Sequence, residues 1–246
     1  MTELAEVKKQ ELLYRGKAKE MYVTNHPDIL WVHYLDQVTA LNGKRKVQMV
    51  DKGKTNCAIS TQLFTDLRNQ GIENHFIKQI GPTDQLVQRV KIIPLETVIR
   101  NNASGSFVKR YQTEYLQKFS QPVIEFFYKN DALDDPFLNE DDALALGLAT
   151  REQISKIRQS SLQINQHLIQ IFEKINVQLV DFKLEFGITQ TGDVILADEL
   201  SPDNCRLVDM QTKQSLDKDI FRKGLGEMVP VYEEVLQRLL QSEEVK

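Results

Sequence analysis

Residues 179–203 read LVDFKLEFGITQTGDVILADELSPD, and this stretch decides the fold. In its first half, Asp181, Lys183 and Glu185 alternate with apolar residues. A period of two is typical of a β-strand with one charged face and one apolar face. A Thr-Gly pair then favours a turn, after which residues 193–198 return as a second strand. The stretch therefore predicts a β-hairpin with a charged face.

A tight turn at this Thr-Gly pair is expected to place Glu185 opposite Asp198. Directly opposed residues have Cβ atoms roughly 5 Å apart, so the two carboxylates repel unless a cation lies between them or they share a proton. One lysine, Lys183, cannot neutralise three carboxylates, whereas a divalent cation such as Mg²⁺ suits carboxylates combined with phosphate oxygens. The charged face of the hairpin is therefore predicted to bind a metal and a charged ligand. The alternative is a strand in which Lys183 only forms salt bridges with Asp181 and Glu185.

The composition is that of an ordinary globular protein. The chain has 246 residues, of which 41% are hydrophobic and 27% charged, which allows one domain or two modest ones. A net charge of -4 argues against general nucleic-acid binding but permits a local basic pocket. The N-terminus has no apolar signal region, and no apolar run approaches the roughly 18 residues that span a membrane. Cys57 and Cys205 lack a CxxC spacing, so reduced thiols in a cytoplasmic protein are expected.

The remaining patterns predict an α+β fold. Expected strands are 12–14, 21–23, 29–35, 74–80, 85–93, 95–100 and 126–128. Expected helices are 55–70, 106–115, a long one that begins at the capping box Thr150-x-x-Gln153, and 218–240, which Pro230 kinks or splits. Residues 39–43 are expected to form a loop. Pro94 marks the predicted boundary between two domains, residues 1–92 and residues 93–246.

Two loops combine cations with small residues. Residues 15–19 read RGKAK, which is not a Walker A motif but suits a hairpin whose Lys17 and Lys19 reach phosphates. The alternative is a solvated basic turn. Residues 100–106 read RNNASGS, and a guanidinium beside backbone N–H groups at a helix start binds anions. Here the alternative is an N-capping serine.

Other cations have ordinary alternatives as well. Lys129 is expected either to line a pocket or to pair with a neighbouring aspartate. Arg206 is expected either to lie over the charged face of the hairpin or to form a surface salt bridge. The basic run 44–54 is expected to form a solvent-exposed face. The alternative is that it flanks an anion-binding pocket. The histidines, among them His33 and His75, show no metal-ligand spacing, and no GxSxG motif indicates a serine hydrolase.

Five motifs in order resemble one family. They are YRGKAK at 14–19, VIRNNASGS at 98–106, FYKND at 127–131, LVDFKLEFG at 179–187, and ADELSPD at 197–203 followed by Arg206. This set is similar to the phosphoribosylaminoimidazole-succinocarboxamide synthase (SAICAR synthetase) family, from about residue 12 to the C-terminal helix. The resemblance implies a fold similar to ATP-grasp enzymes. Residues 1–92 would form a small nucleotide-binding antiparallel-sheet domain, residues 93–246 a larger α+β domain with the metal and ribotide sites, and ATP would lie between them.

The resemblance also implies an activity and a set of residues. The family's reaction joins carboxyaminoimidazole ribotide to L-aspartate with ATP, in de novo purine synthesis. The implied ATP contacts are Lys17, Ala18, Lys19, Gln88, Val90, Lys129, Glu185 and Asp198, of which Glu185 and Asp198 would hold Mg²⁺. The implied substrate contacts are Thr39, Asn42, Arg100, Ser106, Asp181, Lys183 and Arg206, and the implied catalytic residues are Lys129, Asp181, Lys183 and Glu185.

The chain departs from the family's pattern at one place. The family commonly has D-x-[ST]-A-x-[DN]-G after the third strand, whereas residues 36–43 here read DQVTALNG, which shifts Asp36 by one position. A metal-binding role for Asp36 is therefore not expected from the pattern. A small-molecule kinase with the same ATP site and a nucleotide-binding regulatory module are the alternative functions. A homo-oligomer, as a dimer, is expected.

Overall fold

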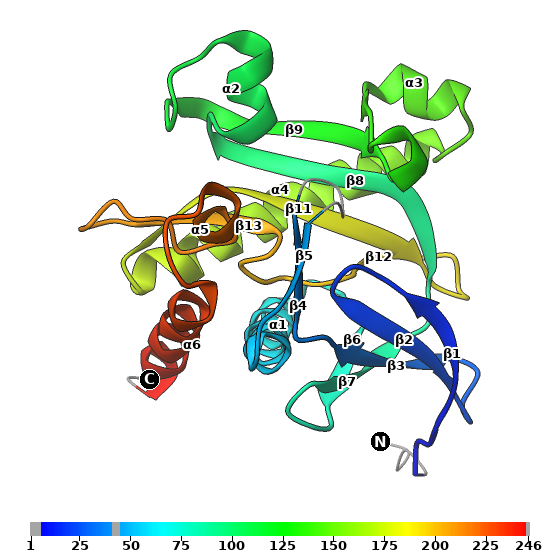
Figure 1. Cartoon of the computed structure of the whole chain (residues 1–246). Helices are drawn as coiled ribbons and strands as arrows, with labels where there is room; N and C mark the ends of the chain where they lie inside the picture. The colour runs from blue at the N-terminus through cyan, green and yellow to red at the C-terminus, as the bar shows by residue number, and fades with distance from the viewer. Residues whose placement is uncertain (1–5, 41–44, 245–246) are drawn as a thin grey trace.

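The computed structural model describes residues 6–40 and 45–244, which form three antiparallel sheets surrounded by helices (Figure 1). The five-stranded sheet contains, in spatial order, β1 (Lys9–Arg15), β2 (Lys19–Thr24), β3 (Ile29–Tyr34), β7 (Asp84–Gln88) and β6 (Phe76–Gln79). The six-stranded sheet contains β10 (Phe137–Leu138), β9 (Lys118–Tyr128), β8 (Lys91–Asn102), β11 (Val177–Ile188) and β12 (Val194–Ala197), with β13 (Cys205–Asp209) also paired to β11. The third sheet pairs β4 (Gln37–Ala40) with β5 (Arg45–Gln48). The α+β fold predicted from the sequence is confirmed.

Six α-helices and one 3-10 turn are described. They are α1 (Lys52–Asn69), α2 (Gly105–Tyr111), η1 (Asp131–Leu133), α3 (Glu140–Ala145), α4 (Arg151–Lys174), α5 (Asp219–Lys223) and α6 (Met228–Glu244). The predicted capping box opens α4, where the Thr150 hydroxyl accepts from the Gln153 amide and the Gln153 side chain accepts from the Thr150 amide. Of the described helices, none is long and apolar enough to cross a membrane.

Strand β11 is the centre of the larger sheet. It pairs with β8 along one edge, and its other edge is shared by β13 and β12. The apolar side chains of β11, including Phe182, Leu184 and Phe186, are buried in the main core together with the apolar stripe of α4. The charged side chains point the other way, which the alternating pattern predicts.

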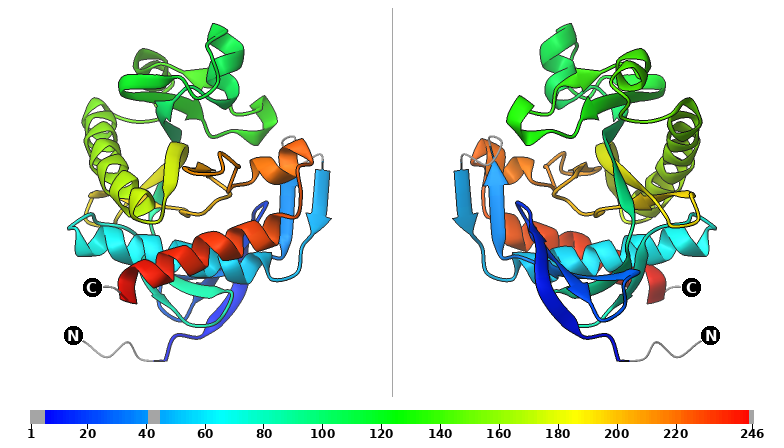
Figure 2. Two further views of the ribbon diagram at one scale, coloured as in Figure 1. Left: turned by 90° about the vertical axis from the view of Figure 1, so that its left-hand side faces the viewer. Right: turned by 90° about the vertical axis from the view of Figure 1, so that its right-hand side faces the viewer.

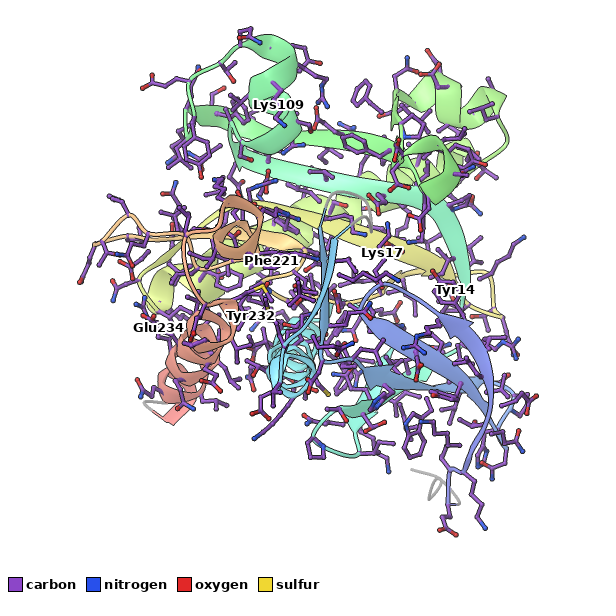
Figure 3. All side chains as sticks on the ribbon, viewed as in Figure 1. Tyr14, Lys17, Lys109, Phe221, Tyr232 and Glu234 are labelled. Carbon is purple, nitrogen blue, oxygen red and sulfur yellow. The ribbon has the colours of Figure 1, made fainter. Side chains whose placement is uncertain are left out.

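The main core crosses the predicted domain boundary. Helix α1 lies beside α6 (Figure 2) and packs against both α6 and β6. Ile59 and Leu63 of α1 belong to the same buried cluster as residues of β8, β11 and α4. A smaller cluster joins Val38 of β4 to Phe221 of α5 and Tyr232 of α6 (Figure 3). The division into residues 1–92 and 93–246 stays a prediction.

The predicted interruption between two strands at Pro94 is wrong, because β8 runs through that residue. Between Ile92 and Glu96 the pairing of β8 with β11 shifts register, opposite Gly187 and Glu185. A proline, which has no N–H to donate, is tolerated within a strand at such a bulge. The two strands expected at 85–93 and 95–100 are therefore β7 and one long strand, β8.

Two further predictions need correction. Thr39 lies in strand β4 instead of a loop, while Asn42 lies outside the described residues. The C-terminal helical stretch is split as predicted, but at residues 224–227 and not at Pro230. Pro230 lies in the first turn of α6, where backbone N–H groups have no helical acceptor in any case.

Candidate active site

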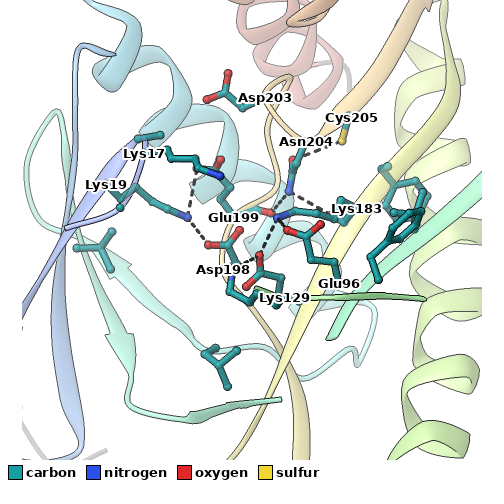
Figure 4. A pocket seen from close by; sticks show the side chains of 18 of the residues that line it. Lys17, Lys19, Glu96, Lys129, Lys183, Asp198, Glu199, Asp203, Asn204 and Cys205 are labelled. Atoms are coloured by element: carbon teal, nitrogen blue, oxygen red, sulfur yellow. Dashed lines mark hydrogen bonds and ion pairs between the residues drawn. The ribbon is translucent and has the colours of Figure 1, made fainter. Parts of the chain in front are cut away.

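A cavity of about 700 Å³ lies between the two larger sheets (Figure 4). All the site residues expected from the sequence line it, except Asn42, which lies outside the described residues. They are Lys17, Ala18, Lys19, Thr39, Gln88, Val90, Arg100, Ser106, Lys129, Asp181, Lys183, Glu185, Asp198 and Arg206. The cavity therefore brings together residues that are far apart along the chain.

The hairpin register differs from the prediction by one position. Glu185 lies opposite Ala197 on β12, and the carboxylate directly opposite it is Glu96 on β8. The Lys183 ammonium donates to both carboxylates, at 2.7 Å in each case. Lys129, which directly follows β9, donates to the same Oε1 of Glu185 at 2.8 Å. Lys183 therefore bridges Glu185 to Glu96, a carboxylate that the sequence pattern did not place there, and Lys129 adds a second cation at Glu185.

Asp198 reaches the site by a different route. It follows β12 with a left-handed φ of 63°, which breaks the alternation of the strand. Its Oδ1 accepts from Lys19 Nζ at 2.6 Å. Burial by itself would raise the pKa of Asp198, but the positive charges of Lys19, Lys183 and Lys129 hold it well below its usual range. Asp198 is therefore an anion that shares its cations with Glu185.

His75 holds the backbone of Asp198. Its Nε2 lies 3.1 Å from the carbonyl oxygen of Asp198. A carbonyl only accepts hydrogen bonds, so Nε2 carries the proton in this contact. The backbone N–H of His75 donates to Leu196 at the end of β12. Burial, followed by the charge of Lys19, lowers the pKa of His75 to about 4, so the ring is neutral near pH 7.

Glu185 and Asp198 are the candidate metal ligands. Among the described residues, no three His, Cys, Asp or Glu side chains lie close enough to hold a metal by themselves. Each of the two carboxylates uses one oxygen for lysine contacts, and no described residue donates a hydrogen bond to Oε2 of Glu185 or Oδ2 of Asp198. Mg²⁺ binds through one or two carboxylates plus substrate phosphates. The donor set therefore fits Mg²⁺ in combination with a phosphate chain.

At the other end of the cavity, Asp181 lies between two arginines. It is directly opposite Arg100 of β8 and Arg206 of β13 in the sheet register. Arg100 Nη1 donates to its Oδ2 at 2.5 Å, Arg206 Nη1 lies 3.0 Å from both oxygens, and Ser104 also donates to Oδ2. Asp181 is only 2% exposed. Both of its oxygens are therefore in contact with the arginines, and the expected substrate contact of Asp181 stays a prediction.

The loop after β8 shapes the space around Arg206. Gly105 has φ +51°, and a Cβ atom there would lie 2.8 Å from Nη2 of Arg206. Only glycine satisfies both the left-handed backbone and the close approach. The hydroxyl of Ser106, one residue later, accepts from Arg100 Nη2 at 3.1 Å. The predicted helix near Ser106 is confirmed as α2, which begins one residue earlier at Gly105.

The β1–β2 turn and the β7–β8 connection form the remaining walls. Lys17 Nζ contacts Asp131 Oδ1 at 2.7 Å, so Asp131 pairs with Lys17 and not with Lys129. Val90 lies so close to Gly187 that a Cβ atom at Gly187 would be 2.3 Å from the Val90 side chain. Gly187 therefore allows β11 and the β7–β8 connection to meet.

Asp36 has a structural role. Its Oδ1 accepts from the Gly53 N–H at 2.8 Å and its Oδ2 from the Asp51 N–H at 3.2 Å. The carboxylate thus caps the start of α1, where it is stabilised by the helix dipole. Within the basic run 44–54, the prediction of a solvated face is wrong for Lys52, which is 1% exposed and pairs with Asp203.

Sequence reasoning missed several residues of the cavity. They are Glu96, Glu199, Asp203, Lys218, Arg222 and His75. Glu199 and Asp203 belong to the quoted ADELSPD motif, and Lys218 and Arg222 are one turn apart, so spacing was an available signal for these four. No local pattern distinguishes His75, whose role depends on contact with a distant segment.

Comparison with known proteins identifies the family of this chain. A family model described as SAICAR synthetase matches residues 12–239. The chain is 58% identical over 240 residues to phosphoribosylaminoimidazole-succinocarboxamide synthase of Lactiplantibacillus plantarum, a match that covers 98% of this chain and 99% of the relative. It is 52% identical over 234 residues to the synthase of the same name in Enterococcus faecalis, covering 95% and 99% of the two chains.

Solved structures give the same result. The crystal structure of phosphoribosylaminoimidazole-succinocarboxamide synthase from Ehrlichia chaffeensis superposes with a TM-score of 0.91 at 43% identity, covering 93% of this chain and 98% of that one. A SAICAR synthetase in complex with ADP superposes with a TM-score of 0.89 at 39% identity, covering 95% and 97%. This chain therefore belongs to the SAICAR synthetase family, the ATP-dependent ligases of purine biosynthesis, and has that family's α+β fold.

Proposed function

We propose that this chain uses ATP to join the carboxylate of carboxyaminoimidazole ribotide to the amine of L-aspartate. The observation that carries the proposal is a single cavity with two cationic ends. One end has the lysine group, Lys19, Lys129 and Lys183, beside two carboxylates. The other end has the arginine group, Arg100 and Arg206. The lysine group suits the ATP phosphates, and the arginine group suits the ribotide phosphate.

The chemistry requires activation of the carboxylate. A carboxylate does not accept an amine directly, because its leaving group would be oxide. Transfer of the γ-phosphoryl group converts it to an acyl phosphate and releases ADP. The aspartate nitrogen then forms the C–N bond while the C–O bond to phosphate breaks and the amine loses a proton. The protein aligns the reactants and neutralises charge, and no protein nucleophile is needed.

Each wall of the cavity has a proposed task. Glu185 and Asp198 would hold Mg²⁺, which when bound neutralises the ATP phosphates. Lys17, Ala18 and Lys19 would cover the phosphates, and the segment with Gln88 and Val90 would hold adenine, mainly through its backbone. These assignments follow the family motifs and are supported by the position of every one of these residues in the cavity wall.

The substrate side is assigned to the opposite end. Arg100, Ser106 and Arg206 would bind the ribotide phosphate, and Lys183 would lie near the imidazole carboxylate. Asp181 would act by holding Arg100 and Arg206 in place, because both of its oxygens are already in contact with them. Thr39, which lines the cavity, would contact the substrates from the β4–β5 side. Asn42, which lies outside the described residues, is assigned to the substrates by the family motif alone.

A coupled ADP-release assay tests the function. The wild-type chain, given ATP, Mg²⁺ and the ribotide, should release ADP in steady state only when L-aspartate is added. The alternative, a small-molecule kinase, releases ADP without the amine, and a regulatory module releases none with both substrates present. Aspartate-independent turnover at the full rate contradicts the ligase proposal.

Glu185→Gln tests the metal assignment separately. Loss of the carboxylate charge should abolish most of the gain in ADP affinity that Mg²⁺ provides, while ADP binding without Mg²⁺ is retained, and kcat should collapse. Titration calorimetry with and without Mg²⁺ gives the readout that does not depend on activity. Asp193→Asn, an exposed change on the same hairpin, is the matched control. An unchanged Mg²⁺ dependence in Glu185→Gln contradicts the assignment.

A homo-oligomer, as a dimer, and a cytoplasmic location are further predictions. Both cysteines are free and buried, which suits a reducing compartment. Light scattering of the full chain at assay concentration measures the oligomeric state, and a monomer there contradicts the dimer.

A further inference from the structure

Lys218, the residue before α5, is a largely buried cation that lies 4.0 Å from its ion-pair partner, Asp203. Its side chain is 12% exposed and lines the cavity. Among the described residues, its ammonium makes no hydrogen bond, and its one ion pair is with Asp203 Oδ1 at 4.0 Å. Burial lowers the pKa of Lys218, the charge of Asp203 opposes this, and the nearby cations Lys52 and Arg222 lower the pKa further. An ammonium in this position gains from an additional anion.

Asp203 does not neutralise Lys218 by itself. Its Oδ2 accepts from Lys52, and its Oδ1 accepts from the Tyr232 hydroxyl at 2.9 Å. One carboxylate therefore stands between two ammonium groups, Lys52 and Lys218. The excess positive charge faces the cavity on the Lys218 side, because Lys52 is 1% exposed and does not line it.

A second cation lies on the same side. Arg222 is one helical turn after Lys218, since its backbone N–H donates to the Lys218 carbonyl at 3.0 Å. Residues at this spacing share a helix face. Arg222 also lines the cavity and is held by Asp219 at 2.7 Å. Thr39, which is 5% exposed, also lines the cavity. Its neighbour in the sequence, Val38, packs against Phe221 of α5.

The position of Lys218 indicates which ligand it serves. The charges that act on it most strongly are Asp203, Lys52, Arg222 and Glu199. Glu199 directly follows Asp198 and pairs with Lys19 at 3.4 Å, so this wall adjoins the lysine group. The reacting carbon of the ribotide must lie between the lysine group and the arginine group. An amine that attacks this carbon must itself be held there by contacts that leave its nitrogen free.

We propose that Lys218, with Arg222, forms the subsite that binds a carboxylate of L-aspartate. The inference rests on the proposed function, and it deepens that function by assigning the third substrate. A carboxylate at Lys218 completes the charge balance around Asp203 and orients the amine toward the space between the two cationic groups. The ribotide phosphate has the same anionic chemistry, so the test must separate the two ligands.

Steady-state kinetics of Lys218→Met make this separation. The substitution keeps the unbranched stem of the side chain and removes the charged terminal ammonium. The KM for L-aspartate should rise by about tenfold or more, as expected for loss of a charge-assisted contact, while the KM values for ATP and the ribotide stay within about twofold. Lys223→Met is the matched control, because Lys223 lies on the same helix, is 49% exposed and does not line the cavity.

Succinate supplies a readout without turnover. It has two carboxylates and no amine, so calorimetry on the enzyme with ADP and ribotide should show binding that weakens in Lys218→Met by about the same factor as the KM. Lys218→Met should fold, since it removes a poorly compensated buried charge. Lys218→Gln serves as a second variant with the same expectation.

The outcomes are distinct. An unchanged aspartate KM in both variants overturns the subsite, and so does a rise in the ribotide KM alone, which would place Lys218 in the phosphate site. Failure of the proposed function shows instead in the wild-type enzyme, as ADP release that does not depend on L-aspartate.

Discussion

Replacing Asp181 by Asn tests how the arginine end of the cavity is held together. Asn keeps the shape of the side chain but removes its charge and replaces one acceptor oxygen with a donor. Arg100 and Arg206 then face an N–H group at hydrogen-bonding distance where they now contact a carboxylate. Burial by itself would lower the pKa of Arg206, but the Asp181 charge, with that of Asp219, raises it, so this carboxylate dominates the surroundings of the guanidinium.

The expected loss of stability is large because the pair is buried. The Asp181 and Arg100 side chains are each 3% exposed, so water does not screen the charges left behind. Removing one partner of a buried ion pair costs about 3–5 kcal/mol. For a chain of this size, that change corresponds to a fall in Tm of roughly 6–20 °C.

Thermal and urea unfolding of the full chain measure the effect. Asp193→Asn, an exposed change on the same β11–β12 hairpin, should shift the unfolding free energy by less than about 0.5 kcal/mol. In the folded fraction of Asp181→Asn, the KM for the ribotide should rise because the guanidinium groups are no longer held. The reasoning is refuted if Asp181→Asn unfolds within 1 kcal/mol of the wild type and has an unchanged ribotide KM.

Three further perturbations test other parts of the site. Gly187→Ala should cost about 1–3 kcal/mol by overpacking against Val90 and raise the nucleotide KM; adding Val90→Ala should relieve only part of both effects, because the Cβ of residue 90 would still lie 2.7 Å from the new Cβ, and persistence of the whole loss in the double variant argues against the contact. His75→Leu should weaken Mg²⁺-dependent ADP binding by about fivefold, the equivalent of one hydrogen bond to Asp198, while His75→Gln, which keeps a donor, restores it; equal affinities for Leu and Gln variants contradict this role. Burial alone would raise the pKa of Asp219, but neighbouring arginines and Lys223 lower it from 3.8 to about 2. Because the pKa of Asp219 is lower in the folded state, the ionised carboxylate contributes about 2 kcal/mol to the free energy of unfolding above pH 4, and this contribution is lost as the pH falls to 2. Unfolding of the wild type and of Asp219→Asn across this pH range measures the difference.

The local elements were predictable because each depends on residues that are close in the sequence. The period-two pattern around Lys183 identified β11, and Thr150 with Gln153 identified the start of α4. Pro94 was misleading, because a proline ends a strand in most settings and whether it occupies a bulge depends on the partner strand. The register of the β11–β12 hairpin was missed by one position because the conformation of a turn is not set by its Thr-Gly pair alone.

The sequence predicted which residues line the site, but not which of their side chains contact one another. Family motifs selected the residues that line the cavity, but they did not show that Glu96 lies opposite Glu185 or that Asp181 is held between two arginines. Those contacts join strands far apart in the chain. His75 was missed for the same reason, since its role depends on a contact with Asp198 from another segment.

By itself, the sequence of residues 179–203 determined that a strand with a charged face lies at the centre of the protein and that Glu185 is on that face. Alternation along a strand is a local property, fixed by the backbone geometry of successive residues. Only the tertiary structure decided which charges meet: Asp198 leaves its strand in a left-handed conformation, Lys183 lies between Glu185 and Glu96, and Lys218 faces Asp203 at 4.0 Å. Electrostatic interactions depend on distance and burial in space, and neither is set by separation along the chain.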